Sequence, residues 1–217
     1  MSDKKSFKQA GVVTGKFITL EGIEGVGKST HLEYVASWLR ERGHAVVVTR
    51  EPGGTPIAER IRSVILEESR DELPALAELL LLFAARAAHL ETLIRPALSR
   101  GEWVVCDRFI DATYAYQGAG RGLSTDIIAE LAAIVQQGLR PDLTILLDIP
   151  LAMSLQRRVA RDQRDRFERE HDAFFARVQK GYREIAAREP ERVRTVASDR
   201  PIAEVKAAIA EIMTNYF

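Results

Sequence analysis

Residues 17–31 have the sequence FITLEGIEGVGKSTH, and this stretch decides the fold. It begins with an apolar run, passes through three glycines and continues into a segment with helical periodicity. Within it, residues 22–29 match G-x-x-x-x-G-K-S/T, the phosphate-binding P-loop. An apolar strand before the motif and a helix after it form the context that the motif requires. We therefore predict that the chain is built around a bound nucleoside triphosphate.

Each part of this motif has a chemical task. The glycines let the backbone turn tightly and bring its N–H groups against phosphate oxygens. Lys28 can reach the β- and γ-phosphates, Ser29 can coordinate Mg²⁺, and the N-terminus of the following helix favours negative charge. The predicted nucleotide-binding residues are Gly22, Ile23, Glu24, Gly25, Val26, Gly27, Lys28, Ser29 and Thr30.

The bulk composition fits one α/β domain. The chain has 217 residues, and its 31 basic side chains balance its 31 acidic ones, so we expect no general affinity for nucleic acid or membranes. No apolar run approaches the roughly 20 residues of a membrane-spanning helix. The single cysteine, Cys106, excludes an intramolecular disulfide and is typical of a cytoplasmic protein. Residues 1–15 lack the apolar core of a signal peptide and are predicted to be a flexible tail before one domain at 16–217.

Apolar runs and helical periodicities alternate along the rest of the chain, a pattern that favours a parallel sheet with right-handed crossovers. The first helix is expected to run to Arg42 and to end at Gly43. Residues 109–122 are rich in glycine and tyrosine, and we predict a loop over a site there. The other expected strands are 45–49, 103–107, 143–148 and 193–196, and the other expected helices are 57–67, 76–98, 125–137, 151–161, 170–188 and 202–215.

Four further features stand where the loops of such a sheet carry function, at the carboxyl ends of strands and on the segments that follow. They are the run REPGGT at 50–55, the pair Phe83 and Arg86, the segment DRF at 107–109 with AYQG at 115–118, and the arginine-dense stretch 157–166. Together with the P-loop they resemble the thymidylate kinase family, nucleoside monophosphate kinases that phosphorylate dTMP. The resemblance runs from about Lys16 to the end of the chain, and TREPGGT and DRF…AYQG are its most specific parts.

The resemblance implies a fold and a reaction. The fold is that of P-loop nucleoside monophosphate kinases: a five-stranded parallel sheet flanked by helices, with a short lid at about residues 157–169. The implied phosphoryl donor is ATP with Mg²⁺, the acceptor is dTMP, and the assembly is a homodimer. Such transfer depends mainly on positioning and on neutralising charge.

Roles can then be assigned to single residues. Lys28 is the expected catalytic lysine. Arg50 and Arg108 are candidates to bind the dTMP phosphate, because guanidinium groups match phosphate oxygens in bidentate fashion. Asp107 is expected either to hold Mg²⁺ through water or to orient a substrate hydroxyl. Glu24 resembles the family's acidic residue near the acceptor sugar and the metal.

Base recognition is expected from Phe83 stacked on thymine and Arg86 on its carbonyl edge. Many relatives separate these two residues by four positions; here they are three apart, and Leu82 holds the four-spaced position. Either spacing places both side chains on one helix face. Tyr116 and Gln117 follow the family's acceptor motif, in which the tyrosine lies against the sugar and disfavours a 2′-hydroxyl.

The lid is expected to supply the catalytic arginine. The variable P-loop positions Ile23, Glu24 and Val26 are not basic, whereas the lid is dense in arginine, so the chain resembles the bacterial, lid-arginine type. Arg161 falls at the catalytic position, with Arg157 one helical turn before it.

Two other functions stay open from the sequence. A deoxynucleoside kinase or another nucleoside monophosphate kinase also carries an Asp-Arg pair and a basic lid, but a nucleoside acceptor needs a carboxylate base more than phosphate-binding arginines. A P-loop nucleotide-binding switch would need no acceptor site, against which Tyr116-Gln117 and Phe83 with Arg86 argue.

Overall fold

The computed structural model describes residues 15–67, 73–159, 167 and 170–217. In this part of the chain the strands form one five-stranded sheet, all parallel, in the order β2-β3-β1-β4-β5. They are β1 (Phe17–Glu21), β2 (Val46–Arg50), β3 (Trp103–Asp107), β4 (Leu143–Asp148) and β5 (Val193–Ala197). The predicted five-stranded parallel sheet is confirmed, and its order places the P-loop strand β1 at the centre.

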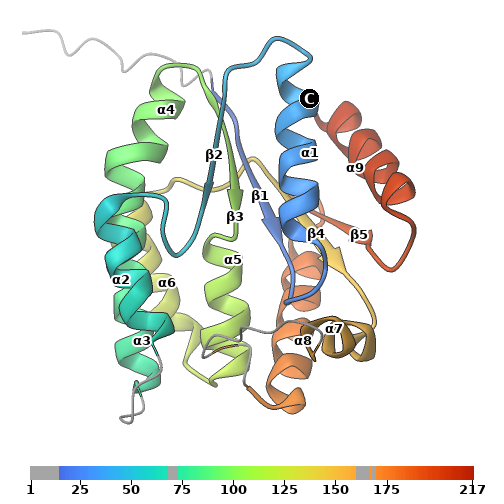
Figure 1. Cartoon of the computed structure of the whole chain (residues 1–217). Helices are drawn as coiled ribbons and strands as arrows, with labels where there is room; N and C mark the ends of the chain where they lie inside the picture. The colour runs from blue at the N-terminus through green and yellow to red at the C-terminus, as the bar shows by residue number, and fades with distance from the viewer. Residues whose placement is uncertain (1–14, 68–72, 160–166, 168–169) are drawn as a thin grey trace, which may run out of the picture.

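Helices cover both faces of the sheet (Figure 1). α1 packs on β2 and β3 and lies beside α9, whereas α8 packs on β4 and β5. The helices are α1 (Lys28–Arg40), α2 (Pro56–Leu66), α3 (Ala75–His89), α4 (Arg95–Ser99), α5 (Ile110–Thr113), α6 (Thr125–Gln136), α7 (Leu151–Val159), α8 (Asp172–Arg188) and α9 (Ile202–Tyr216), with π-helical segments η1 (Leu90–Ile94) and η2 (Tyr114–Gly120).

The long helix expected at 76–98 is present, but a π-helical segment divides it into α3, η1 and α4. Pro96 stands in the first turn of α4. Because proline has no N–H and its ring crowds the preceding turn, a regular α-helix cannot continue through it. The wider π-turn just before Pro96 lets the helical segments follow one another without a loop.

The expected loop at 109–122 is wrong: this segment is helical, formed by α5 and η2. Gly120 of this segment serves close helix packing, whereas Gly122 has φ of 78° and takes the chain out of η2 in a left-handed conformation. A Cβ on Gly120 would lie 2.7 Å from the ring of Phe174, and one on Gly181 in α8 would lie 2.8 Å from the Cβ of Ala119. Small residues on both helices therefore bring η2 tightly against α8.

The core lies on both sides of β1, because successive side chains of a strand point to opposite faces. Ile18 and Leu20 belong to one buried cluster and Phe17 to the other. The strand expected at 45–49 is present as β2, which is an edge strand, and its valines at 46–48 are only half-buried. An edge strand has a neighbour on one side alone, so its side chains are less enclosed.

The expected tail lies almost wholly outside the described residues, since only Gly15 of it is placed. Among the described residues no helix is long and apolar enough to cross a membrane. All five strands end at the same edge of the sheet, and that edge carries the site.

Candidate active site

The P-loop joins β1 to α1 and wraps around Lys28. The side chain is buried, and its Nζ donates to the carbonyl oxygens of Gly22 (3.2 Å) and Ile23 (3.3 Å). Burial lowers the pKa of this ammonium to about 8, and the cationic Arg108 nearby acts in the same direction. A Cβ on Gly22 would lie 2.4 Å from the carbonyl oxygen of Leu147, so glycine is required there. Among the described residues, the hydrogen-bond acceptors for this cation are carbonyls of its own loop, a site suited to anionic phosphate.

Two residues fit a magnesium ion at this loop. Ser29 is exposed in the first turn of α1, and Asp107 ends β3 opposite Leu20 of β1. Asp107 Oδ1 is buried and has no hydrogen-bond partner among the described residues. A buried carboxylate oxygen is unfavourable until something donates to it, and water bound to Mg²⁺ is such a donor. Mg²⁺ in phosphotransferases keeps several waters and is bound by one or two protein ligands together with substrate phosphates, so these two residues fit such an ion.

Arg108, Glu24 and Tyr116 form one cluster beside the P-loop. Arg108 Nη2 donates to Glu24 Oε1 (2.8 Å) and to the Gly22 carbonyl (3.1 Å), and it lies 2.8 Å from the Tyr116 hydroxyl. The Tyr116 hydroxyl donates to the Glu24 carboxylate at 2.7–2.8 Å. Burial alone would raise the pKa of Glu24, but Arg108 and Lys28 outweigh it and lower that pKa. Glu24 is therefore an anion that positions both neighbours.

Arg86 lines the same pocket and is 2% exposed. Its Nε donates to Glu51 Oε2 (2.7 Å) and its Nη2 donates to Thr113 Oγ1 (2.9 Å). His89 Nδ1 lies 3.1 Å from Glu51 Oε1, so the carboxylate is held from two sides. The remaining nitrogen of Arg86, Nη1, is buried without a partner among the described residues. This arginine is fixed in place and keeps one donor for a ligand.

The structure corrects the expected stacking residue. Phe83 is 2% exposed and packs in the core with Leu79 and Phe109, and it does not line the pocket. Leu82, at the four-spaced position before Arg86, lines the pocket instead. Neighbouring residues on a helix point about 100° apart, so only one of the two can face the ligand. Phe83 acts on the site indirectly, with its ring 5.0 Å from the Arg86 guanidinium.

Gln117 lines the pocket as expected, and its Nε2 donates to Glu78 Oε1 at 2.7 Å. Glu78 is fully buried on α3, so it fixes the orientation of the amide. Arg50 is placed differently. Its side chain is 54% exposed, pairs with Glu59 at 3.0 Å and does not line the pocket. The structure therefore brings Arg108, but not Arg50, into contact with the cluster around Glu24.

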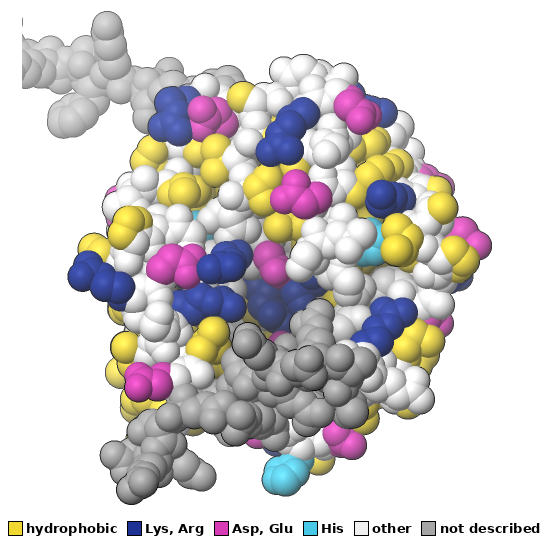
Figure 2. Space-filling model, in the orientation of Figure 1, with side chains coloured by type: hydrophobic (Ala, Val, Ile, Leu, Met, Phe, Trp, Pro, Cys, Tyr) yellow, Lys and Arg dark blue, Asp and Glu magenta, His cyan; other side chains and the backbone are white. Residues whose placement is uncertain are grey.

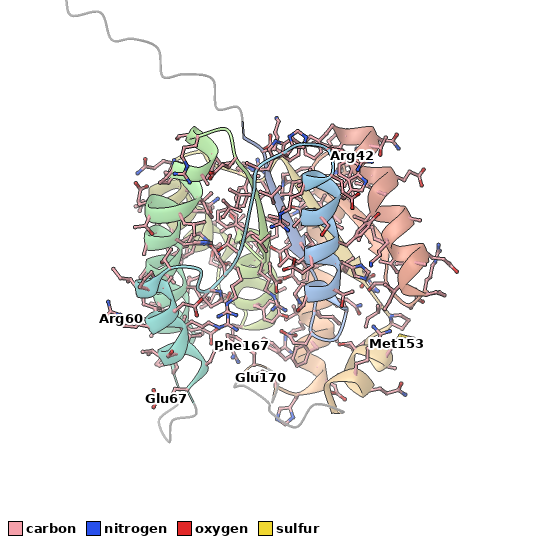
Figure 3. The ribbon with its side chains drawn as sticks, turned by 45° about the horizontal axis from the view of Figure 1, so that its top comes forward. Arg42, Arg60, Glu67, Met153, Phe167 and Glu170 are labelled. Carbon is pink, nitrogen blue, oxygen red and sulfur yellow. The ribbon has the colours of Figure 1, made fainter. Side chains whose placement is uncertain are left out.

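The lid residues are only partly described. Arg157 on α7 is exposed, and its Nη1 donates to the Gly25 carbonyl of the P-loop at 2.9 Å. Arg161 lies outside the described residues. Phe167 lines the pocket and meets the Tyr116 ring edge to face, with 6.0 Å between ring centroids. Figure 3 shows Phe167 and Glu170 together beyond the ends of the strands.

Figure 2 shows a hollow on this face that contains basic and acidic side chains side by side. The pocket joins residues from α2, α3, α5 and η2 to the P-loop glutamate. Sequence reasoning missed several of its lining residues, which are Glu51, Pro52, Arg62, Leu66, Thr113 and Phe167. Glu51 and Pro52 belong to the quoted REPGGT motif, and Thr113 stands between Arg108 and Tyr116, so proximity to these motifs could have indicated them. Arg62, Leu66 and Phe167 do not lie next to these motifs in the sequence.

A P-loop at the end of β1, an aspartate at the end of β3 and a second pocket across the strand ends define a P-loop nucleoside monophosphate kinase. The family model for thymidylate kinase matches residues 20–209. The chain is 58% identical over 196 residues to a thymidylate kinase of Methylococcus capsulatus, covering 90% of this chain and 93% of that one. It is 58% identical over 204 residues to one of Chromohalobacter salexigens, covering 93% and 96%. The chain therefore belongs to the thymidylate kinase family.

The fold agrees with that assignment. A crystal structure of thymidylate kinase from Ehrlichia chaffeensis superposes with a TM-score of 0.76 at 31% sequence identity. The match covers 92% of this chain and 98% of that one. The sequence-based assignment to this family is confirmed.

Proposed function

We propose that this chain transfers the γ-phosphoryl group of ATP to dTMP, giving dTDP and ADP. The observation that carries the proposal is the pocket beside the P-loop, which two hydrogen-bonded arginines line. Arg86 keeps a buried Nη1 and Arg108 keeps a buried Nε, each without a partner among the described residues. A nucleoside monophosphate has a carbonyl-bearing base at one end and a phosphate at the other, so its two ends match these two donors.

The donor side rests on the P-loop. The backbone of residues 22–27 and Lys28 would hold the β- and γ-phosphates of ATP. Ser29 and Asp107 would hold Mg²⁺, which would neutralise phosphate charge there. Lys28 contributes a fixed positive charge, and Glu24 keeps Arg108 aimed toward the space between the two substrates. The residues of this chain thus bind, orient and neutralise, which is what phosphoryl transfer requires.

The acceptor side distinguishes the candidate bases. Arg86 would donate to a thymine carbonyl, with Leu82 against the ring and Gln117 beside it. Tyr116 has its hydroxyl committed to Glu24 and its ring enclosed by Phe167 and Phe174, so it forms a rigid wall. We propose that this wall lies against the sugar and leaves no room for a 2′-hydroxyl. Arg50 would reach the acceptor phosphate only after it leaves Glu59.

The alternatives of the same superfamily are weaker. A deoxynucleoside kinase needs a carboxylate that is available to take a proton from a 5′-hydroxyl. Glu24, the carboxylate in the pocket nearest to Arg108, is occupied by hydrogen bonds from Arg108 and Tyr116. A P-loop switch would have no use for the Arg86 end of the pocket.

We expect dTMP and dUMP to be phosphorylated far better than ribothymidine monophosphate or any purine monophosphate. A coupled assay of ADP release across nucleoside monophosphates, each at equal concentration with saturating ATP, measures this preference. Thymidine without phosphate serves as the control for a deoxynucleoside kinase. A clear preference for AMP, CMP or thymidine would overturn the proposal, and ATP hydrolysis unaffected by every acceptor would favour the switch.

We also propose that two copies of the chain assemble through α2, α3 and α6. α3 contacts both α2 and α6, and all three helices expose large aliphatic side chains. The exposed fractions reach 50% for Leu76, 49% for Leu80 and 69% for Ile134. An exposed apolar surface rimmed by polar residues is typical of an interface between subunits. A second copy of the same surface is the partner that closed twofold symmetry provides.

Replacing both Leu80 and Ile134 by glutamate should convert the dimer into a monomer. Burying two carboxylates without partners in an apolar interface is strongly unfavourable, on the order of several kcal/mol. Light scattering after size exclusion measures the mass. Ile202→Glu on α9 is the matched control, because Ile202 is 58% exposed and lies on a different helix. A wild-type chain that is monomeric at micromolar concentration would contradict the proposal.

A further inference from the structure

Glu21 is a fully buried carboxyl group at the end of β1, and the steps proposed above do not use it. Its Oε1 accepts a hydrogen bond from the backbone N–H of Phe109 at 2.7 Å. Its Oε2 lies 2.7 Å from the hydroxyl oxygen of Tyr182, within hydrogen-bond distance. One side chain therefore joins the strand that enters the P-loop, the turn after β3 and the helix α8. Burying a carboxyl group costs free energy that its hydrogen bonds must offset. We therefore ask which part of the backbone these hydrogen bonds hold in place.

The turn that Glu21 holds is the one that carries Arg108. Arg108 has φ of 67°, a left-handed conformation that non-glycine residues rarely adopt. Such a backbone persists only where its surroundings hold it on both sides. The N–H of Arg108 donates to Leu20 at 3.0 Å, and the next N–H, of Phe109, donates to Glu21. Consecutive residues of β1 thus clamp consecutive amides of the turn.

The conformation decides where the guanidinium points. With this turn in place, Arg108 Nη2 reaches back over the P-loop to Gly22 and Glu24. If Phe109 loses its partner, the left-handed residue can relax to an ordinary conformation, and its side chain then leaves in another direction. The Arg108 side chain depends on the Phe109 amide through the backbone, not through contact with Glu21.

Several charged and titratable groups surround Glu21. Asp111 on α5, Arg108 on the turn and Tyr182 on α8 act on it directly, and Lys28 and Cys106 lie within its electrostatic reach. Burial raises the pKa of Glu21 to about 8, with the charge of Asp111 acting in the same direction. The group is therefore mainly neutral at pH 7, and glutamine is its closest substitute in shape and charge.

We propose that Glu21 is a positioning residue for the acceptor: by holding the Phe109 amide, it keeps Arg108 aimed at the acceptor phosphate. The inference rests on the proposed function, because it takes Arg108 to be the phosphate-binding arginine. Glu21 touches neither nucleotide, so it acts on one substrate only, through the turn.

The test compares Glu21→Met with Glu21→Gln. The two substitutes have nearly the same length, but only glutamine keeps a carbonyl oxygen for the Phe109 amide and an NH₂ group for the Tyr182 oxygen. Glu21→Met should raise KM for dTMP about 10-fold or more. This is the effect of losing one well-aligned charge-assisted hydrogen bond from Arg108 to the acceptor phosphate. KM for ATP should stay within about twofold, because the P-loop is unchanged. Glu21→Gln should restore KM for dTMP at pH 7.

A matched control and a second variant keep the result interpretable. Thr19 lies two residues earlier on the same buried strand, and its Oγ1 is 2.7 Å from Thr144 Oγ1. Thr19→Val removes a buried hydrogen bond away from the turn and should leave both KM values unchanged. If Glu21→Met does not give folded protein by circular dichroism, Tyr182→Phe removes the other partner of Glu21 and should shift KM for dTMP in the same direction.

The outcomes separate this inference from the proposed function. Glu21→Met with wild-type KM values, or with KM for ATP raised as much as KM for dTMP, overturns the positioning role. The positioning role is also overturned if Glu21→Gln has the same raised KM for dTMP as Glu21→Met. If Glu21→Met does not fold, an unchanged KM for dTMP in Tyr182→Phe overturns it instead. Arg108→Ala is measured alongside: if it leaves KM for dTMP unchanged, Arg108 is not the phosphate-binding arginine and the proposed function fails at that point. If Arg108→Ala raises it and Glu21→Met does not, only the inference is wrong.

Discussion

Lys28→Ala should abolish most phosphoryl transfer while leaving the fold intact. Loss of one fixed positive charge at the β/γ-phosphates removes on the order of 3 kcal/mol or more of transition-state stabilisation, which is about 100-fold or more in rate. The fold should survive because Nζ makes only two long hydrogen bonds to carbonyls of its own loop. Turnover is measured by ADP release with dTMP as acceptor, and folding is checked by circular dichroism.

A second lysine provides the control for this experiment. Lys180 on α8 is 77% exposed and pairs with Glu184, so Lys180→Ala should change neither turnover nor fold. Near-normal turnover of Lys28→Ala would mean that residues 22–29 are not the catalytic loop. Loss of the fold in Lys28→Ala would mean that burial of the ammonium organises the loop, and Lys28→Met, which keeps the length of the side chain, would then separate charge from packing.

The sheet could be predicted from sequence because buried parallel strands are apolar throughout and helices have a different period. Residues 103–107 and 143–148 have this property, and both are strands at the expected positions. Since the carboxyl ends of parallel strands share one edge, the prediction that the P-loop and Asp107 lie together followed from topology alone. That prediction is confirmed by the register that pairs Leu20 with Asp107.

The features that could not be predicted from the sequence depend on how helices and side chains pack against one another. Glycines at 118, 120 and 122 indicated a loop, but a glycine that lets two helices approach closely has the same letter as one that turns a chain. Helical spacing placed Phe83 and Arg86 on one face, yet the choice between Phe83 and Leu82 depends on how α3 is rotated against its neighbours. Glu21 lies in an apolar strand, and no sequence motif pointed to a role for its side chain. Its hydrogen bonds to the Phe109 amide and the Tyr182 hydroxyl indicate the positioning role.

Arg161 is expected to supply the largest single contribution from the lid. The variable positions of the P-loop, Ile23, Glu24 and Val26, carry no positive charge, so charge that develops on the transferring phosphoryl group must be met from elsewhere. Lys28 and the proposed Mg²⁺ would meet part of it. An arginine that reaches the phosphoryl group from a separate segment is worth roughly 10³-fold or more in rate. Arg161 itself lies outside the described residues, and its role is proposed from the sequence.

Arg157 is the natural comparison, because it donates to the Gly25 carbonyl of the P-loop. A contact that holds the nucleotide-binding loop contributes to both the ground state and the transition state. Removing such a contact should weaken ATP binding more than it slows turnover. Arg157→Ala is therefore expected to raise the Kd of ATP with a small effect on kcat, and Arg161→Ala should do the reverse.

We expect Arg161→Ala to lower kcat by roughly 10³-fold while both nucleotides bind with nearly unchanged Kd, because an interaction made mainly in the transition state affects rate alone. Turnover comes from the coupled assay and both Kd values from calorimetry. Arg42→Ala is the control, since Arg42 stacks on Trp38 after the C-terminal end of α1, remote from the P-loop (Figure 3). If Arg161→Ala only weakens ATP binding, the residue is a ground-state contact. If it changes neither quantity, the arginine-dense stretch is a solvated surface, and the charge on the phosphoryl group is met by Lys28 and Arg108 without the lid.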